Sequence, residues 1–220
     1  MINVVIADDD DLVRAGIRAI VETSPEITVV AEAGNGGEAI AQARKWRPDV
    51  VLMDLDMPRC DGLCATRRLL TEPDPPKVLV LTTFGMDENI TAALHAGASG
   101  FLMKQLTPQQ LIHAVSTVVA GGTVLSPAVT QQLLTHVARP GSQRKARIRA
   151  MAAKLSERER EVFGLLGQGL GNAEISEQLH LTTSTVKTHV SRILVKLEVE
   201  NRTQAALVAF ELDLLPATGA

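Results

Sequence analysis

The chain has 220 residues, which suits one large domain or two small ones. Its 45 % hydrophobic and 21 % charged residues are ordinary for a globular protein and argue against disorder. No apolar run approaches the roughly 18 residues that a membrane span needs. Charged residues begin at Asp8, so a signal peptide is not expected either. We therefore expect a cytoplasmic protein that makes no use of a membrane.

The net charge of −3 is divided unevenly along the chain. Residues 1–138 hold 10 Lys and Arg against 16 Asp and Glu, a net of −6, whereas residues 139–220 hold 12 against 9, a net of +3. This asymmetry suggests a cation or basic surface as partner of the first part and a polyanion as partner of the second. Two cysteines, Cys60 and Cys64, are too few for a disulfide framework or a zinc site.

The first 120 residues alternate between short apolar runs and longer amphipathic ones. The short runs are rich in β-branched residues and predict strands buried on both faces, at residues 4–7, 27–31, 50–53, 78–81 and 100–103. The longer runs predict helices at residues 11–23, 35–46, 61–71, 87–97 and 107–120. This alternation predicts an α/β fold, a five-stranded parallel doubly wound sheet with helices on both faces.

The composition changes after this part of the chain. Residues 126–138 predict one more helix, because Ser126 suits its N-cap and Pro127 its first position. Residues 139–153 hold five basic residues and no acid, which favours an interdomain linker, although a solvated helical arm fits nearly as well. We therefore expect domains at 1–122 and 154–220, joined by a linker helix and basic linker at 123–153.

The second predicted domain is small and all-α. Ser156 and Glu159 form a capping-box pattern that opens a helix running to about Gln168. Further helices are expected at 172–179, 183–197 and 202–212, and a tight turn separates the second from the third. This arrangement predicts a helix-turn-helix module. Its apolar positions at helical spacing are expected in the core: Ile175, Leu179, Val186, Val190, Ile193 and Leu197.

Five polar residues follow the predicted strands of the first domain: Asp8, Asp9, Asp54, Thr82 and Lys104. The carboxyl ends of parallel strands meet at one edge of a sheet, where ligands bind. One acid after a strand is usually a helix N-cap, but five such residues predict a site. Converging carboxylates make a hard oxygen site suited to Mg²⁺. A carboxylate beside the metal can act as a nucleophile and form an aspartyl phosphate, with a cation neutralising the phosphoryl oxygens.

Four sequence motifs resemble the receiver domains of response regulators over about residues 2–120: VVIADDDDLVR, DVVLMDLDMPRCDG, VLVLTTF and GASGFLMK. The resemblance implies that Asp54 is the phosphoacceptor and that Lys104 is the conserved lysine. It also implies that Asp8 and Asp9, with Asp54 and the backbone carbonyl of Asp56, hold the metal. Thr82 would be the switch hydroxyl and Phe101 the switch aromatic, although an ordinary core role for Phe101 is equally open.

Two positions depart from the pattern of these receivers. Asp10 stands where many relatives carry histidine, and we expect it to cap the following helix. Gln105 stands where receivers often have proline, which excludes a cis Lys-Pro bond.

The stretch LSEREREVFGLLGQGLGNAEISEQLHLTTSTVKTHVSRILVKLEVENRTQAA resembles the four-helix DNA-binding domain of NarL/FixJ and LuxR regulators. In such proteins the second helix of the motif, here 183–197, enters the major groove. Lys187, Thr188 and Ser191 are then expected at base edges. Arg192, Lys196 and Arg202 are expected at phosphates, and Thr183 and Ser184 at the helix N-terminus could also donate to phosphate. A solvated surface role is the alternative for each, and His189 is assigned no chemistry.

Together the two resemblances imply a two-component response regulator. A sensor histidine kinase would phosphorylate Asp54, and this would control dimerisation, sequence-specific DNA binding at promoter operators and transcription. No enzyme activity is expected beyond the receiver's own phosphoryl transfer and dephosphorylation.

One rival is a Mg²⁺-dependent phosphohydrolase, suggested by Asp54-Leu55-Asp56 but disfavoured by Pro58 and by the motif's place after the third strand. The other rival is a regulator controlled without phosphorylation.

Overall fold

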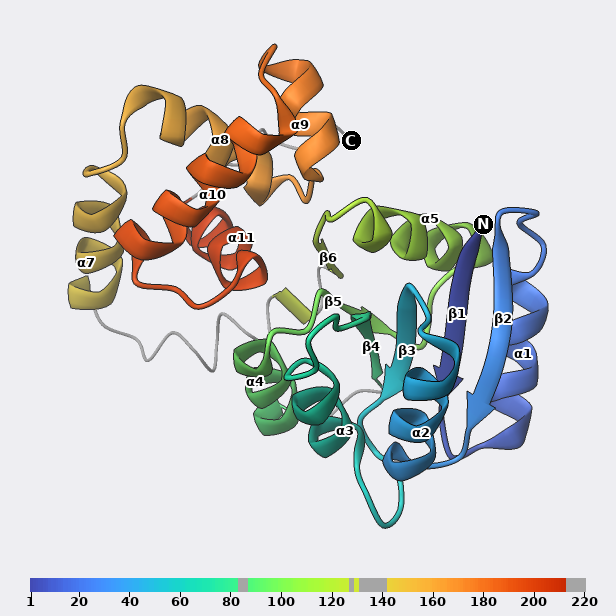
Figure 1. Ribbon diagram of the computed structural model, residues 1–220. Helices are drawn as coiled ribbons and strands as arrows, with labels where there is room; N and C mark the ends of the chain where they lie inside the picture. The colour runs from blue at the N-terminus through green and yellow to red at the C-terminus, as the bar shows by residue number, and fades with distance from the viewer. Residues whose placement is uncertain (83–86, 127–128, 131–141, 213–220) are drawn as a thin grey trace.

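The computed structural model describes residues 1–82, 87–126, 129–130 and 142–212 (Figure 1). The first domain alternates strands and helices: β1 (Ile2–Ala7), α1 (Asp11–Val21), β2 (Ile27–Ala33), α2 (Gly36–Trp46), β3 (Val50–Asp54), α3 (Gly62–Leu69), β4 (Lys77–Thr82), α4 (Asp87–Ala96), β5 (Gly100–Met103), α5 (Pro108–Val119) and β6 (Val124–Leu125). None of the helices in the described ranges is long and apolar enough to cross a bilayer.

The strands form one parallel sheet in the order β2-β1-β3-β4-β5-β6. Helices α1 and α5 pack on one face through a cluster that includes Ile17 and Leu111. Helices α2, α3 and α4 pack on the other face through Ile40, Leu69 and Ile90. Both faces are therefore buried, as the apolar runs of the strands require, and the predicted doubly wound α/β fold is confirmed.

The sheet has one strand more than the sequence predicts, counted over the described residues. The two residues of β6 pair with Gly100 and Phe101 of β5. A strand this short carries no periodicity that could identify it, and only its neighbour β5 makes it a strand. The helix predicted at 126–138 falls mostly on residues outside the described ranges.

The second domain contains α7 (Ser142–Ala152), α8 (Glu157–Gly167), α9 (Asn172–Gln178), α10 (Thr183–Leu197) and α11 (Arg202–Glu211). Its core contains the six apolar residues expected there, with Leu179 and Val190 partly buried. The capping box predicted at the start of α8 is confirmed, because Ser156 and Glu159 exchange side-chain and backbone hydrogen bonds.

The described part of the basic segment before this domain, from Ser142 on, is the helix α7. Ile148 and Met151 of α7 are buried in the same core as Val162 and Phe163 of α8. The sequence leaves open an interdomain linker or a solvated helical arm. The described residues form a helix, and one face of this helix is buried in the core of the second domain. The domain boundaries predicted at 122 and 154 stay predictions.

The N-terminal end of α11 packs against the end of α4 (Figure 1). Asn201 Nδ2 donates to the Leu94 carbonyl at 2.9 Å, and the buried Thr203 hydroxyl donates to the Ala98 carbonyl at 2.8 Å. Leu207 of α11 adds an apolar contact to the cluster of the first domain. The last carbonyls of a helix lack partners within that helix. Side chains of the second domain therefore satisfy carbonyls at the end of α4.

A second contact joins the turn after α8 to the turn after α5. The Thr123 N–H donates to the Gly169 carbonyl at 3.0 Å. A Cβ atom on Gly122 would lie 2.5 Å from that carbonyl oxygen, and one on Gly171 would lie 2.5 Å from the Ala120 oxygen. The backbones approach this closely only because both positions are glycine.

We expect Thr203→Val to weaken the docking of the two domains by roughly 1–3 kcal/mol, because the buried Ala98 carbonyl loses its donor while the side-chain volume is kept. Denaturant unfolding followed by probes in each domain measures this as an earlier, separate transition of the second domain. Ser176→Ala, which removes a similar hydrogen bond within α9, is the matched control and should leave the domains coupled. Coincident transitions in Thr203→Val would contradict the expectation.

Candidate functional site

Three carboxylates meet at the carboxyl ends of neighbouring strands. Asp8 follows β1 and Asp54 ends β3, and these two strands pair directly. Asp8 and Asp54 are buried, whereas Asp9 is exposed. One ligand oxygen from each of the three lies within 4.8 Å of the others. The structure thus brings together the acids that the sequence singles out.

Lys104, directly after β5, supplies positive charge to this cluster. Its ammonium lies 2.7 Å from Asp8 Oδ2 and 3.2 Å from Asp54 Oδ2. Burial opposes the charge of this lysine, but the contact with Asp8 and the charge of Asp54 outweigh it and raise the pKa of Lys104. The lysine therefore stays protonated and offsets part of the repulsion between the two buried acids.

Burial raises the pKa of Asp54 above its ordinary value. The Lys104 charge and the Asp56 backbone N–H both act to lower it, and the neighbouring Asp8 charge acts to raise it. The balance leaves an ionised Asp54 less solvated than in water, and such a carboxylate gains from an added cation.

The donor set fits a divalent metal. Asp8 Oδ2 is buried and accepts no well-aligned hydrogen bond, although the Lys104 ammonium lies close to it. An unsatisfied carboxylate oxygen among three acids is a suitable ligand for a hard cation. The cluster could therefore bind a divalent cation through Asp8, Asp9 and Asp54.

The structure also places the other residues predicted for the first domain. Thr82 is the last residue of β4, is buried, and accepts a hydrogen bond from the Lys104 N–H through its carbonyl at 2.8 Å. Phe101 is fully buried in β5. Asp10 caps α1 by accepting from the Leu12 and Val13 N–H groups, as expected.

Arg14 is a residue that the sequence reasoning missed. Its guanidinium donates to the Asp8 carbonyl at 2.6 Å and pairs with Asp11 and Glu32. It thereby fixes the backbone that presents Asp8 and Asp9. Its place one turn into the helix after the acids is a signal that could have been used.

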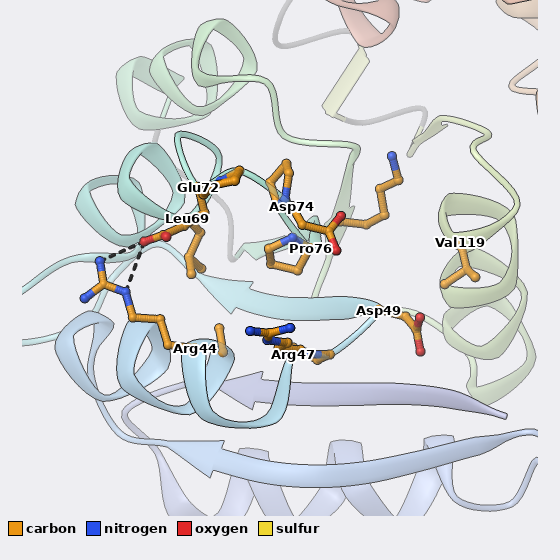
Figure 2. Close-up of a pocket in the computed structure, with 13 residues that line it drawn as sticks. Arg44, Arg47, Asp49, Leu69, Glu72, Asp74, Pro76 and Val119 are labelled. Atoms are coloured by element: carbon orange, nitrogen blue, oxygen red, sulfur yellow. Dashed lines mark hydrogen bonds and ion pairs between the residues drawn. The ribbon is translucent and has the colours of Figure 1, made fainter.

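A cavity of about 680 Å³ lies away from the acidic cluster (Figure 2). Its lining includes Asp49 and Lys77, which stand at the starts of β3 and β4, and the ion pair between Arg44 and Glu72. The acids instead lie at the opposite, carboxyl ends of the strands. Because its rim mixes both charge signs, the cavity does not indicate one class of ligand.

The polar face of α10 is open to solvent. Six of the side chains expected to contact DNA are exposed there: Thr183, Ser184, Lys187, Thr188, Ser191 and Arg192. The opposite face is buried through Val186, Ile193 and Leu197. Thr182 is the N-cap of α10, accepting from the Thr185 N–H at 3.1 Å. The first domain covers α11 and leaves this face of α10 accessible.

Two predicted phosphate contacts are instead engaged inside the protein. Lys196 pairs with the buried Glu159 at 2.6 Å. Arg202 donates to the Leu170 carbonyl and to Asn172, and burial lowers its pKa to about 10. Sequence spacing does not reveal such partners, because they come from other helices. These contacts weigh against a phosphate role for either residue, which stays a prediction.

We expect Asp54→Asn to raise the melting temperature at pH 7 in metal-free buffer. A carboxylate whose pKa is raised by folding destabilises the native state above that pKa, by about 1.4 kcal/mol per pKa unit. For a chain of this size, each kcal/mol changes the melting temperature by roughly 2–4 °C. The gain should shrink as the pH falls through the raised pKa of Asp54, and it should vanish below about 4, where the acid becomes protonated in the unfolded state as well. Thermal unfolding against pH measures this, with the exposed Asp74→Asn as control. A lower melting temperature at pH 7 would contradict it.

Both halves of the chain match known families. Residues 4–116 match the response regulator receiver domain, and residues 153–209 match the bacterial regulatory proteins of the luxR family. The transcriptional regulatory protein LnrK of Bacillus subtilis is 42 % identical over 215 residues, covering 94 % of this chain and 96 % of LnrK. The response regulator protein VraR of Staphylococcus aureus is 39 % identical over 214 residues, covering 97 % and 99 %.

Two solved structures of response regulators are similar to this chain over nearly its full length. The response regulator ChrA of a heme-sensing two-component system is 37 % identical, covering 97 % of this chain and 98 % of ChrA, with a TM-score of 0.55. RcsB of Salmonella typhimurium is 27 % identical, covering 95 % and 97 %, with a TM-score of 0.57. The chain therefore belongs to the response regulators of two-component systems, with a receiver domain and a LuxR-type helix-turn-helix domain that acts in transcription.

Proposed function

We propose that Asp54 is the phosphoacceptor and that its phosphorylation controls sequence-specific DNA binding by α10. The observation that carries this proposal is the buried Asp54 carboxylate, held with Asp8, Asp9 and Lys104 at the carboxyl edge of the sheet. A sensor histidine kinase or a small phosphodonor would supply the phosphoryl group, and the cytoplasm would be the compartment.

In the proposed transfer, an Asp54 carboxylate oxygen attacks the phosphorus of a phosphohistidine on the kinase. The new O–P bond forms as the P–N bond breaks, and the imidazole leaves with the electron pair. The Lys104 ammonium, 3.2 Å from Asp54 Oδ2, is placed to neutralise a phosphoryl oxygen. Hydrolysis of the same acyl phosphate would return the carboxylate.

Mg²⁺ is the proposed cofactor of this site. Asp8, Asp9 and Asp54 would hold it, together with the backbone carbonyl of Asp56, and it would neutralise phosphoryl oxygens when bound. Arg14 and the Lys104 contact would keep the Asp8 segment in place with or without the metal.

The proposed switch passes from Thr82 to α11. Drawing Thr82 and Lys104 toward a phosphoryl group would move the end of β4 and the α4 that follows it. Helix α4 holds α11 through Leu94 and the Ala98 carbonyl just after it. A shift of this element would therefore change the docking of the second domain. Phe101, which has no hydroxyl, would follow by packing alone.

The reading of DNA is assigned to the exposed face of α10. Lys187, Thr188 and Ser191 would contact base edges, and Arg192 would contact phosphate, as Thr183 and Ser184 would at the helix N-terminus. A homodimer would read two half-sites about one helical turn apart. A related solved structure, 26 % identical to this chain, is that of two RcsB dimers bound to two parallel DNAs, which supports this arrangement.

Incubation with a small acyl phosphate donor and Mg²⁺ should place one phosphoryl group on the chain, as an acyl phosphate that hydroxylamine removes. We expect Asp54→Asn to abolish this labelling, because the amide is no nucleophile. Intact mass before and after hydroxylamine treatment measures it, with the exposed Asp74→Asn as the matched control that keeps labelling. Persistent labelling of Asp54→Asn would remove Asp54 as the phosphoacceptor.

For α10, we expect Lys187→Ala to weaken binding to a selected operator by roughly 1–3 kcal/mol and to relax its sequence preference. Selection of binding sites from random duplexes, followed by titration of the selected site, measures both effects. Lys45→Ala on the receiver surface is the control. Unchanged affinity and preference in Lys187→Ala would take this residue out of the reading face.

A further inference from the structure

The segment that matches the luxR family carries no net charge. Residues 153–209 hold 7 Lys and Arg and 7 Asp and Glu. Residues 139–152, just before it, hold five basic residues and no acid. This basic segment lies outside both family matches, which cover 4–116 and 153–209. Cations at phosphates supply essentially all of the non-specific affinity of proteins for DNA. The positions of the basic residues therefore decide which surface can contact the DNA backbone.

Several cations of the neutral segment are already engaged within the protein. Lys196 pairs with Glu159, Arg158 pairs with Glu161, and the partly buried Arg202 donates to Asn172 and to the Leu170 carbonyl. Four of its seven cations are exposed: Lys154, Arg160, and Lys187 and Arg192 on the reading face of α10. The module therefore presents fewer cations to the phosphate backbone than its sequence contains.

Helix α7, which contains four of the five basic residues, is fixed to the C-terminal end of α10 (Figure 1). Ile148 and Met151 are buried in the core that also holds Leu197. Arg147 pairs with Glu198, the residue that ends α10. Arg149 is exposed and has no ion-pair partner among the described residues. Helix α7, with Arg147 and Arg149, is thus packed against the core of the second domain.

The length of α10 places its C-terminal end near the phosphates of the DNA backbone. Its 15 residues make a helix of about 22 Å, whereas the major groove is about 12 Å wide. A helix of this length that enters the groove by its N-terminal half extends to the groove edge, where the phosphates lie. An element fixed at its C-terminal end then faces the DNA backbone.

We propose that α7 is part of the DNA interface and contacts backbone phosphates that flank the site read by α10. The proposal rests on the proposed DNA-binding function and adds to it a surface outside the matched module. Its partner is the phosphodiester backbone, so its contribution is independent of base sequence and sensitive to salt.

The test is the salt dependence of binding by the full chain to a random-sequence duplex of about 30 base pairs. One variant replaces all four cations of α7 with Gln: Arg144→Gln, Lys145→Gln, Arg147→Gln and Arg149→Gln. Each lost phosphate contact flattens the slope of log K against log salt by about 0.9. Because Arg147 is already paired with Glu198, we expect a decrease between about 0.9 and about 2.7. Circular dichroism and thermal unfolding establish that the variant is folded.

The matched control removes four exposed cations from the receiver: Lys45→Gln, Arg67→Gln, Arg68→Gln and Lys77→Gln. It changes the net charge equally and should leave the slope unchanged. The single variant Arg149→Gln, at an exposed position without an ion pair, should flatten the slope by about 0.9 and keeps the test decisive if the fourfold variant is unstable.

The proposal is overturned if the slope is unchanged in the folded fourfold variant. If that variant does not fold, an unchanged slope in Arg149→Gln overturns it. An equal decrease in the receiver control also overturns it, because net charge rather than the place of α7 would then be responsible. If the unmodified chain binds no DNA with or without phosphorylation, the proposed function itself fails, which is a different result.

Discussion

The ion pairs between Lys104 and the buried carboxylates of Asp8 and Asp54 are the interaction on which the first domain's site depends. The parallel sheet forces these acids together, because β1 and β3 are neighbours and both end at the same edge. Two buried charges of one sign repel each other and lose hydration. Lys104 offsets this cost only in part, since the pKa of Asp54 remains raised and the buried Asp8 Oδ2 has no partner beyond the Lys104 ammonium.

This incomplete compensation links stability to function. A site whose charges were fully satisfied by the protein would gain little from a divalent cation or a phosphoryl group. Here the shortage of positive charge leaves part of the stabilisation to a ligand, so binding can alter the balance between two arrangements of the elements nearby. The sheet edge is therefore both the proposed place of the chemistry and the place where a change of charge would act on the fold.

The contacts of α11 provide a route by which the proposed change would reach the second domain. Asn201 caps its own helix through its oxygen and donates to the α4 carbonyl of Leu94 through its nitrogen. One side chain thus joins the end of a receiver helix to the start of a helix in the DNA-binding domain. The exposed face of α10 is not part of this contact. In this arrangement the receiver holds the DNA-binding domain by a face other than the one assigned to reading DNA.

The sequence by itself determined the alternation of strands and helices, the identity of the five polar residues at the sheet edge, and the buried stripe of the reading helix. These features follow from local periodicity and from motifs whose members have fixed places on their strands. Even the capping roles of Asp10 and Ser156 could be predicted, since the partners of a cap lie within three residues.

Only the tertiary structure decided features that depend on distant partners. The pairing of β6 with β5, the engagement of Lys196 by Glu159, and the burial of Arg202 join residues from separate elements. The same holds for α7. Its polar sequence fits a linker as well as a helix, and only the burial of Ile148 and Met151 in the core of the second domain distinguishes the two. The physical reason is common to all of them. The free energy of burial and of ion pairing depends on what lies across the contact, and a sequence read along one element does not contain that information.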